Sequence, residues 1–480
     1  MNQPRVSVIM PTYNCARYIA EAIESVLGQT MPSWELIIVD DGSADTTAEV
    51  VARFDDPRIR YVRQAKAGAS RARNTGLALA GAAYLAFIDA DDAYHPEKLA
   101  VQAGYLDQHA DVGLAYVSRI EIDQHGNRVN LARLPDETTL PTVVLGIPFA
   151  PTDCMVRRGW IERVGNFSEA FVVNEDRHLY IRLVLDGCRC VGIERFLAYR
   201  RLDTARRVDD LPARLDDMLR SLDAAFQDPR CPGEVRALTD AAHRNIFLAC
   251  AYQAAMQNEA SLAQAWFRDA VRLGPSILDD NAEVVLQEVS HVATRDGGDH
   301  EARLGLFFRH LPPEFEWLGR HRDWVVARGY LLRGARDIMW GRCDAGRAHL
   351  ELALRRGARV DERVLQTVVD QLLNYELAVG TTAAEIAVLS LCRELRHAAG
   401  GGPARRLQGR VLVNRAFAQY RRGEYAKVVP NAAAAMVTDP SYVTNRGAVS
   451  ILVRSLAKVL GRQFHRRDTS AALADKPPCP

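Results

Sequence analysis

The chain has 480 residues, of which 48% are hydrophobic and 25% are charged, and its net charge is +1. These values are typical of ordinary globular proteins and exclude a generally basic chain that binds nucleic acid. There is no apolar run of 18 residues and no signal-peptide pattern, and the nine cysteines lack metal-site spacing. We therefore expect a cytoplasmic protein of two or three domains with free thiols.

Strands and helices alternate through the first 90 residues. Short apolar runs predict buried strands at residues 6–10, 35–39, 58–62 and 83–88. Apolar residues at helical spacing predict helices at residues 16–27, 45–54 and 68–80. This alternation predicts right-handed βαβ crossovers and a parallel sheet, in which ligands bind beyond the carboxyl ends of the strands.

Polar residues follow the predicted strands. Residues 11–14 follow the first strand, Asp40 and Asp41 follow the second, and three carboxylates occur within residues 89–92. Clustered carboxylates are costly unless a cation neutralises them, and Mg²⁺ and Mn²⁺ prefer carboxylate oxygens and often share a site with phosphates. The pattern predicts a divalent metal and a phosphorylated substrate at this edge. The alternative is an acidic turn that caps the next helix.

Two arginines, Arg71 and Arg73, stand at the start of the third predicted helix. A helix start with nearby cations suits a diphosphate, although a solvated helix end is the alternative. The first strand is not followed by G-x-G-x-x-G, and G-x-x-x-x-G-K-[ST] does not occur. The glycine pattern therefore argues against dinucleotide-dependent redox enzymes and Walker-type nucleotidases.

Five segments together resemble the family 2 glycosyltransferases. They are residues 6–14, 25–30, 35–43, 68–76 and 87–92, with sequences VSVIMPTYN, SVLGQT, ELIIVDDGS, GASRARNTG and FIDADD. The match is collinear over about residues 4–100 and continues more loosely to about 200. The resemblance implies a GT-A fold, which is a Rossmann-like α/β domain that binds a nucleotide sugar. It also implies an inverting, metal-dependent hexosyltransferase.

The resemblance implies a donor pocket at the ends of the first two strands. Four consecutive residues would line the base and ribose pocket: Pro11, Thr12, Tyr13 and Asn14. The pyrimidine ring would hydrogen-bond to Asp41 or to its neighbour Asp40. A UDP-sugar is the favoured donor, and a saccharide or lipid-linked molecule is the expected acceptor, as in polysaccharide biosynthesis.

The resemblance also implies where the diphosphate and the metal bind. Arg73 would approach the diphosphate. Asp89, Ala90 and Asp91 would form the DXD element at the donor, with Asp91 as the main metal ligand and Asp89 as the second. Mn²⁺ or Mg²⁺ would be the cofactor.

Residues 100–200 should carry the acceptor side. Strands are predicted at residues 112–117 and 151–156, with a hairpin over 121–129. By its resemblance to the family's Glu-Asp segment at a helix start, Asp176 is the candidate general base. A carboxylate suits this role, because the acceptor proton becomes acidic only as the new bond forms. The alternative is that Asp176 only caps its helix.

One segment departs from the family pattern. Many relatives have a Tyr-Arg-x-His segment whose histidine helps at the metal or diphosphate, but the matching stretch here, residues 197–207, has no histidine. Its arginines could supply the positive charge, and the sequence does not choose among them: Arg200, Arg201, Arg206 and Arg207. The Gln-x-x-Arg-Trp motif of processive synthases is absent, which favours transfer of a single sugar.

From about Asp209 the composition changes to segments rich in Ala, Leu and Arg with helical spacing. We predict a GT-A domain over residues 1–205, an α-helical, tetratricopeptide-like repeat domain over 206–467, and a disordered tail over 468–480. Three hairpins with small residues at repeat-like offsets begin near Asn258, Gly341 and Gly423, and residues 400–403 are read as a flexible link. This domain either binds a protein partner or only stabilises the catalytic domain.

The basic, amphipathic segment 451–467 has two interpretations. It either lies on an anionic membrane at the inner face, where lipid-linked acceptors are found, or packs as a terminal repeat helix. For the whole chain, the alternative to an active transferase is a catalytically weak domain that serves as an assembly scaffold. A sugar nucleotidyltransferase would need a Gly-rich loop with a lysine or arginine after the first strand, and residues 11–14 have neither.

Overall fold

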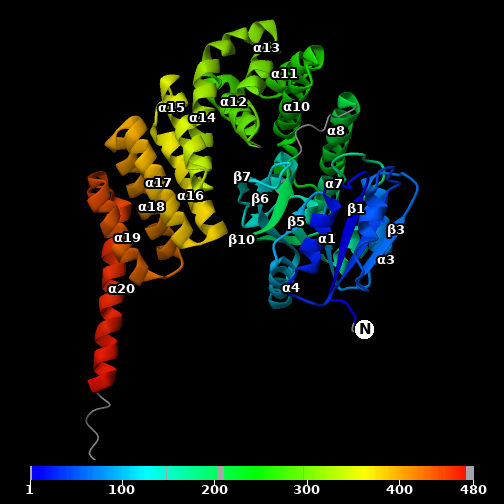
Figure 1. The fold of residues 1–480 in the computed structure, drawn as a ribbon, viewed down its shortest axis with the longest axis horizontal. Coiled ribbons are helices and arrows are strands. Elements are labelled where there is room, and N and C mark those ends of the chain that lie inside the picture. The colour runs from blue at the N-terminus through cyan, green and yellow to red at the C-terminus, as the bar shows by residue number, and fades with distance from the viewer. Residues whose placement is uncertain (1–2, 147–148, 203–209, 296, 472–480) are drawn as a thin grey trace, which may run out of the picture. The chain divides into compact units, whose positions relative to one another are not determined.

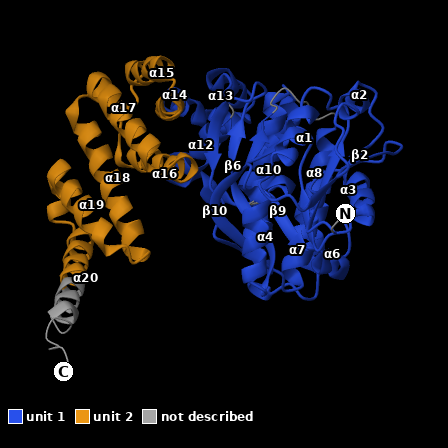
Figure 2. Ribbon diagram, turned by 60° about the horizontal axis from the view of Figure 1, so that its bottom comes forward, with its two compact units in different colours: residues 1–326 blue, residues 327–480 orange. Residues whose placement is uncertain are grey.

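The computed structural model describes residues 3–146, 149–202, 210–295 and 297–471, with side chains as far as Leu460. The chain forms two compact units, residues 1–326 and residues 327–480 (Figure 2). The predicted boundary between residues 205 and 206 lies outside the described residues. The helices from α8 to α13, which follow that boundary, belong to the first compact unit.

A ten-stranded mixed sheet forms the centre of the first unit among the described residues (Figure 1). Its strands are β1 (Val6–Thr12), β2 (Trp34–Asp40), β3 (Ile59–Arg63), β4 (Tyr84–Phe87), β5 (Ala93–Tyr94), β6 (Val112–Ile122), β7 (Arg128–Ala132), β8 (Glu137–Thr138), β9 (Cys154–Arg157) and β10 (Arg189–Arg201). The strand order is β3-β2-β1-β4-β9-β6-β10-β5, with β7 beside β6 and β8 beside β10.

Helices cover both faces of the sheet. They are α1 (Ile19–Leu27), α2 (Thr47–Val51), α3 (Ala69–Leu79), α4 (Lys98–Gln108), α5 (Leu140–Leu145), α6 (Arg158–Val164) and α7 (Glu175–Leu185). Because side chains alternate along a strand, Leu36 and Ile38 pack with α1, while Ile37 and Val39 pack with α3. Helix α3 approaches β1 so closely that a Cβ at Gly76 would lie 2.5 Å from the Ile9 side chain.

The prediction of a parallel sheet is confirmed for the first four strands, since β1 pairs in parallel with β2 and β4, and β2 with β3. Beyond them the sheet is mixed, because β9 runs antiparallel to both β4 and β6. The predicted strand at 151–156 is wrong in its first half, where Pro151–Asp153 forms a 3₁₀ turn. The predicted hairpin at 121–129 is confirmed by the pairing of β6 with β7.

The described residues from Leu211 onward are mainly helical. In order they form α8 (Leu211–Gln227), α9 (Gly233–Arg236), α10 (Thr239–Met256), α11 (Ala260–Leu273), α12 (Asp279–Thr294), α13 (His300–Arg309), α14 (Arg322–Met339), α15 (Cys343–Arg355), α16 (Glu362–Val379), α17 (Thr381–Ala399), α18 (Gly401–Arg421), α19 (Tyr425–Thr438) and α20 (Arg446–Ala471). Within the described residues, none of these helices is long and apolar enough to cross a bilayer.

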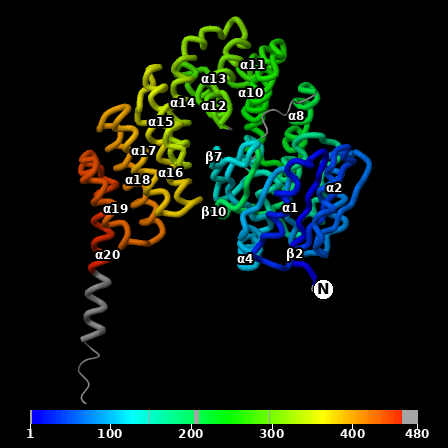
Figure 3. The backbone as a smooth tube through the Cα atoms, viewed as in Figure 1, coloured from blue at the N-terminus to red at the C-terminus, as the bar shows by residue number. Residues whose placement is uncertain are grey.

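The three predicted hairpins are the helix pairs α10–α11, α14–α15 and α18–α19, which Figure 3 traces along the backbone. Their turns contain Asn258, Gly341 and Gly423, each with a positive φ. Residues 400–403 are not a flexible link, because only Gly400 separates α17 from α18 and the next two glycines begin α18. The tetratricopeptide-like assignment stays a prediction.

Candidate active site

The ends of β1 and β2 are tied together by Asn14. Its N–H donates to the Ser43 hydroxyl (2.9 Å), and its side-chain oxygen accepts from the N–H of Ala44 (2.8 Å). This placement requires a left-handed backbone at Asn14 (φ 49°), which asparagine tolerates better than most residues. The two polar strand ends therefore meet at one edge of the sheet, as the alternation of strands and helices predicts.

Two residues beside Asn14 present groups that a ligand could contact. The Tyr13 ring is 42% exposed, and the Lys66 ammonium lies 4.1 Å from its centre. The Thr12 hydroxyl is buried and has no hydrogen-bond partner among the described residues. A buried hydroxyl without a partner is costly, which makes it a candidate contact for a bound molecule. Pro11 precedes it as part of β1 and is half-buried.

Asp40 and Asp41 perform different structural roles. Asp40 has no exposed surface, and its two oxygens accept from the N–H of Ser43 (2.7 Å) and the hydroxyl of Tyr61 (2.5 Å). Burial, together with the hydrogen bond to Asp40, raises the pKa of Tyr61 to about 12.

Asp41 holds the loop that leads into α3. Its carboxylate accepts from the N–H groups of Ala67 (2.9 Å) and Gly68 (2.7 Å) and from the side chain of Gln64 (2.8 Å). Asp41 therefore fixes the position of the helix that carries Arg71 and Arg73.

The acidic loop after β4 has one buried and two half-buried carboxylates. Asp92 is 3% exposed, and it accepts from the Thr152 hydroxyl (2.6 Å) and the N–H of Arg201 (2.8 Å). Burial, with the charges of Asp91 and Asp89, raises the pKa of Asp92 well above its usual range. Asp89 and Asp91 keep exposed surface, while Ala90 between them is buried.

These residues fit a divalent cation that also binds substrate oxygens. The negative charges of Asp91 and Asp89 destabilise ionised Asp92, and a bound cation would offset this repulsion. The carboxylates of Asp89 and Asp91 are hard oxygen ligands. Among the described residues, no group of three or more His, Cys, Asp and Glu side chains forms a complete metal cage. A cation bound by Asp89 and Asp91 would therefore need further ligands, such as substrate oxygens.

Asp176 lies at the start of α7. The N-cap position is Asn174, in the left-handed region (φ 60°), and its side chain makes no capping hydrogen bond. Asp176 is therefore in the first turn and not at the cap, and its Oδ1 accepts from the N–H of Arg177 (2.7 Å). Burial, followed by the charge of Glu175, raises the pKa of Asp176 to about 6, although Arg73 acts in the opposite direction.

Arg73 connects the acidic loop to α7. Its guanidinium donates to Asp89 (2.8 Å) and to Glu175, and it is 5% exposed. Burial opposes its charge, but the carboxylates of Asp89, Glu175 and Asp176 outweigh burial and raise the pKa of Arg73. The structure thus joins three segments that are far apart in sequence, at residues 73, 89 and 175–176.

Arg201 supports the acidic loop from β10. Its guanidinium donates to the Asp91 carbonyl (3.0 Å), the Asp123 carbonyl (2.9 Å) and the Glu21 carboxylate (2.5 Å). Its neighbour Arg200 is half-buried and close enough to lower the pKa of Asp92. The other two candidate arginines, Arg206 and Arg207, lie outside the described residues.

Three contacts of this site have no sequence prediction: Thr152 with Asp92, Glu175 with Arg73, and Arg201 with the acidic loop. Glu175 is adjacent to Asp176, so its position was available from sequence. Nothing local to Thr152 indicates that its hydroxyl contacts Asp92, 60 residues away.

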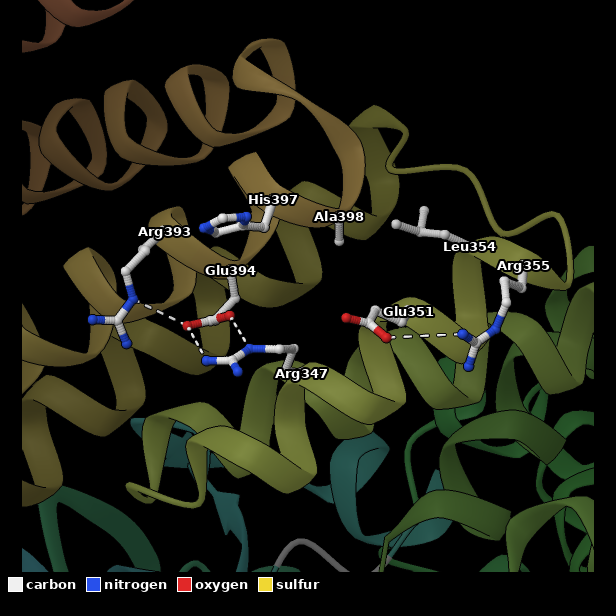
Figure 4. Close-up of a pocket in the computed structure, with 8 residues that line it drawn as sticks. All are labelled: Arg347, Glu351, Leu354, Arg355, Arg393, Glu394, His397 and Ala398. Atoms are coloured by element: carbon white, nitrogen blue, oxygen red, sulfur yellow. Dashed lines mark hydrogen bonds and ion pairs between the residues drawn. The ribbon is translucent and has the colours of Figure 1, made fainter.

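A groove of about 620 Å³ lies elsewhere, between α15 and α17 of the second unit (Figure 4). The buried carboxylate of Glu394 accepts from Arg347 (2.7 Å) and Arg393 (3.0 Å) at one end. The groove is lined by Arg347, Glu351, Leu354, Arg355, Arg393, Glu394, His397 and Ala398. It contains none of the predicted site residues.

Comparison with known proteins gives a family for the sheet domain. The model of glycosyl transferase family 2 matches residues 7–165. A glucosyltransferase of Escherichia coli, which transfers from UDP-Glc to alpha-D-GlcNAc-diphosphoundecaprenol, is 32% identical over 188 residues. That match covers 39% of this chain and 72% of the relative.

Other similar proteins are longer or more distant. An uncharacterized glycosyltransferase of Rickettsia conorii is 33% identical over 153 residues, which are 31% of this chain and 25% of the relative. The chain likewise spans only 21% and 20% of two further relatives. The crystal structure of S. aureus TarS 1–349 in complex with UDP has 18% identity and a TM-score of 0.41, over 74% of this chain and 92% of that one.

Proposed function

The chain belongs to glycosyl transferase family 2, and from this premise we propose that it transfers a sugar from a nucleotide-diphosphate sugar to an acceptor hydroxyl, with inversion at the anomeric carbon. One observation carries the proposal. Arg73 bridges Asp89 of the acidic loop and Glu175, which precedes Asp176 at the start of α7. This bridge supports a proposed donor site that is close to the candidate base.

Asp176 acts as the general base in this proposal. It accepts the proton of the acceptor hydroxyl while that oxygen bonds to the anomeric carbon and the bond from this carbon to the diphosphate breaks. With a pKa of about 6, its carboxylate is ionised at neutral pH and still basic enough to take a proton. A divalent cation held by Asp91 and Asp89 would supply charge to stabilise the leaving diphosphate.

We assign the donor contacts by position. The base and ribose contact Pro11, Thr12, Tyr13 and Asn14. The pyrimidine contacts Asp41 or its neighbour Asp40; Asp41 is favoured because it keeps 5% exposed surface, whereas Asp40 has none. Arg73, Asp89 and Ala90 lie at the diphosphate end. A UDP-sugar is the preferred donor, as the name of the E. coli relative gives for that protein.

The proposed acceptor is a saccharide, lipid-linked as in the name of the same relative. Helix α20 suits peripheral contact with an anionic membrane, because Val453 (58%), Leu456 (39%) and Leu460 (50%) are exposed beside Arg454 and Lys458. A second role, binding of a partner by the helical unit, is favoured by the arginine-lined groove between α15 and α17.

The test is donor binding and hydrolysis across UDP-, GDP- and dTDP-sugars, with and without Mn²⁺, on wild type and Asp91→Ala. We expect one donor to bind in a metal-dependent way, and Asp91→Ala to weaken it at least about tenfold, as loss of a metal ligand does. The exposed Asp55 provides the control variant, Asp55→Ala, which should bind like wild type. If no donor binds, the transferase proposal is rejected and the scaffold role is favoured.

A further inference from the structure

We propose that Arg73 is a positioning residue for the base, because its paired contacts with Glu175 and Asp89 link the first turn of α7 to the acidic loop. The inference rests on the proposed function, in which Asp176 is that base. Glu175 then has a role as the partner of Arg73. Arg73 itself does more than contact the donor, because it also orients the base.

The contacts form a buried fork. One terminal nitrogen of Arg73 donates to Asp89 (2.8 Å) and the other to Glu175, whose side chain is 11% exposed, while that of Arg73 is 6% exposed. The guanidinium carbon lies 5.4 Å from the centre of the Phe167 ring. A planar guanidinium can reach two carboxylates in fixed directions, whereas a lysine ammonium is a single point charge.

Removing Arg73 would leave the buried Glu175 carboxylate without its guanidinium partner, whereas removing Glu175 would leave Arg73 paired with Asp89. Glu175 accepts from Arg73 in a site with little solvent, so loss of the guanidinium would expose the base to an uncompensated neighbouring carboxylate. The Arg73 Nε is also buried and has no hydrogen-bond partner among the described residues. Its position is thus determined by the two carboxylates and by packing.

The same two residues act on Asp176 in opposite directions. Burial and the Glu175 charge raise the pKa of Asp176, whereas the Arg73 charge lowers it. Several other charged or titratable groups face Asp176: Arg177 and Tyr180 on α7, Cys154 on β9, and Asp89 in the acidic loop. Of all these groups, Arg73 and Glu175 are in direct contact with each other, so they can be tested as a pair.

The test compares Arg73→Met, Arg73→Lys, Glu175→Gln and the double variant. Because Asp176 must be ionised to act, kcat/KM should fall as the pH drops through its pKa. We expect the acid limb to move up by about one pH unit in Arg73→Met and down in Glu175→Gln, with Arg73→Lys and the double variant between them. A merely structural role would not shift the limb in opposite directions.

A second readout does not depend on turnover. The carboxyl carbon of Asp176, identified by its loss in Asp176→Asn, can be titrated by NMR in the metal-free full-length chain, and the same opposite shifts are expected. The matched control is Arg71→Met on the same helix. Arg71 is exposed and, among the described residues, forms an ion pair with Glu169 (3.1 Å), so its loss should leave the titration of Asp176 unchanged.

The outcomes separate the two proposals. Shifts of the same sign in Arg73→Met and Glu175→Gln, or no shift in either, would overturn the positioning role. If Arg73→Met does not fold, the other two variants still test the proposal. Glu175→Gln must lower the pKa of Asp176, and Arg73→Lys must raise it slightly. Opposite NMR shifts in a chain that transfers no sugar from any donor would keep the positioning role and reject the proposed function.

Discussion

Asp176 carries a charge that the fold disfavours and that the proposed chemistry requires. Burial and Glu175 raise its pKa from 3.8 to about 6. Because the folded carboxyl holds its proton more tightly than the unfolded one, the free energy of unfolding falls as the pH rises from about 4 to about 6. We expect Asp176→Asn to abolish transfer yet to be about 1 to 3 kcal/mol more stable than wild type at pH 8.

Urea denaturation at pH 8 and pH 4.5 measures this difference. The gain of the asparagine variant should shrink at the lower pH, where Asp176 is protonated in the folded chain. Asp55→Asn, at an exposed site, should be neutral at both values. A gain that does not change with pH would show that Asp176 is not the titrating group.

At the scale of elements, β10 supports the acidic loop through Arg201, whose side chain is 2% exposed. Arg201→Met removes donors from the Asp91 and Asp123 carbonyls and from Glu21. We expect a loss of about 2 to 4 kcal/mol in stability, as for other buried charged donors, and donor binding weakened at least about tenfold because the loop shifts. Chemical denaturation and donor titration check the two effects.

The same strand offers a matched control in Arg195, which is 43% exposed and pairs with Glu97 (2.6 Å). Arg195→Met should cost less than about 1 kcal/mol, as exposed ion pairs do, and should leave donor binding intact. Equal effects of the two substitutions would contradict a specific role for Arg201 in the loop.

Local patterns predicted the elements well where one segment forms them. The apolar runs predict β1, β2 and β4, and the small residues at repeat-like offsets predict the helix hairpins whose turns contain Asn258, Gly341 and Gly423. The contacts between distant segments could not be predicted. Arg73 and Glu175, for example, are 102 residues apart, and the local sequence around one gives no information about the other. The position of β9 between β4 and β6, antiparallel to both, likewise depends on tertiary packing and could not be predicted from a short local segment.

The candidate site divides in the same way. The acids at the strand ends were predictable because parallel strands end at one edge. Which acids keep exposed surface was not predictable, because the buried acids Asp40 and Asp92 contact Tyr61 and Thr152, which lie 21 and 60 residues away. The sequence therefore predicts a carboxylate-rich edge of the sheet, and packing determines which of these carboxylates keep exposed surface.

At the scale of the molecule, helices after residue 210 complete the unit that contains the site. Glu121 on β6 has no exposed surface and accepts from Arg295, which follows α12 (2.7 Å). Burial opposes its ionisation, but Arg295 and Arg119 lower the pKa of Glu121 to about 2. Asp217 on α8 also accepts from the N–H of Val172 (2.7 Å), just before α7.

These contacts predict that a fragment of residues 1–326 unfolds cooperatively and binds donor like the full chain, whereas a fragment of residues 1–205 does neither. In the full chain, Arg295→Met should cost about 2 to 4 kcal/mol, because it leaves the buried Glu121 short of a partner. Thermal unfolding and donor titration of both fragments and of this variant provide the measurements. A stable, donor-binding 1–205 fragment would instead support an independent sheet domain ending at residue 205, because the contacts from α8 and α12 would then be dispensable.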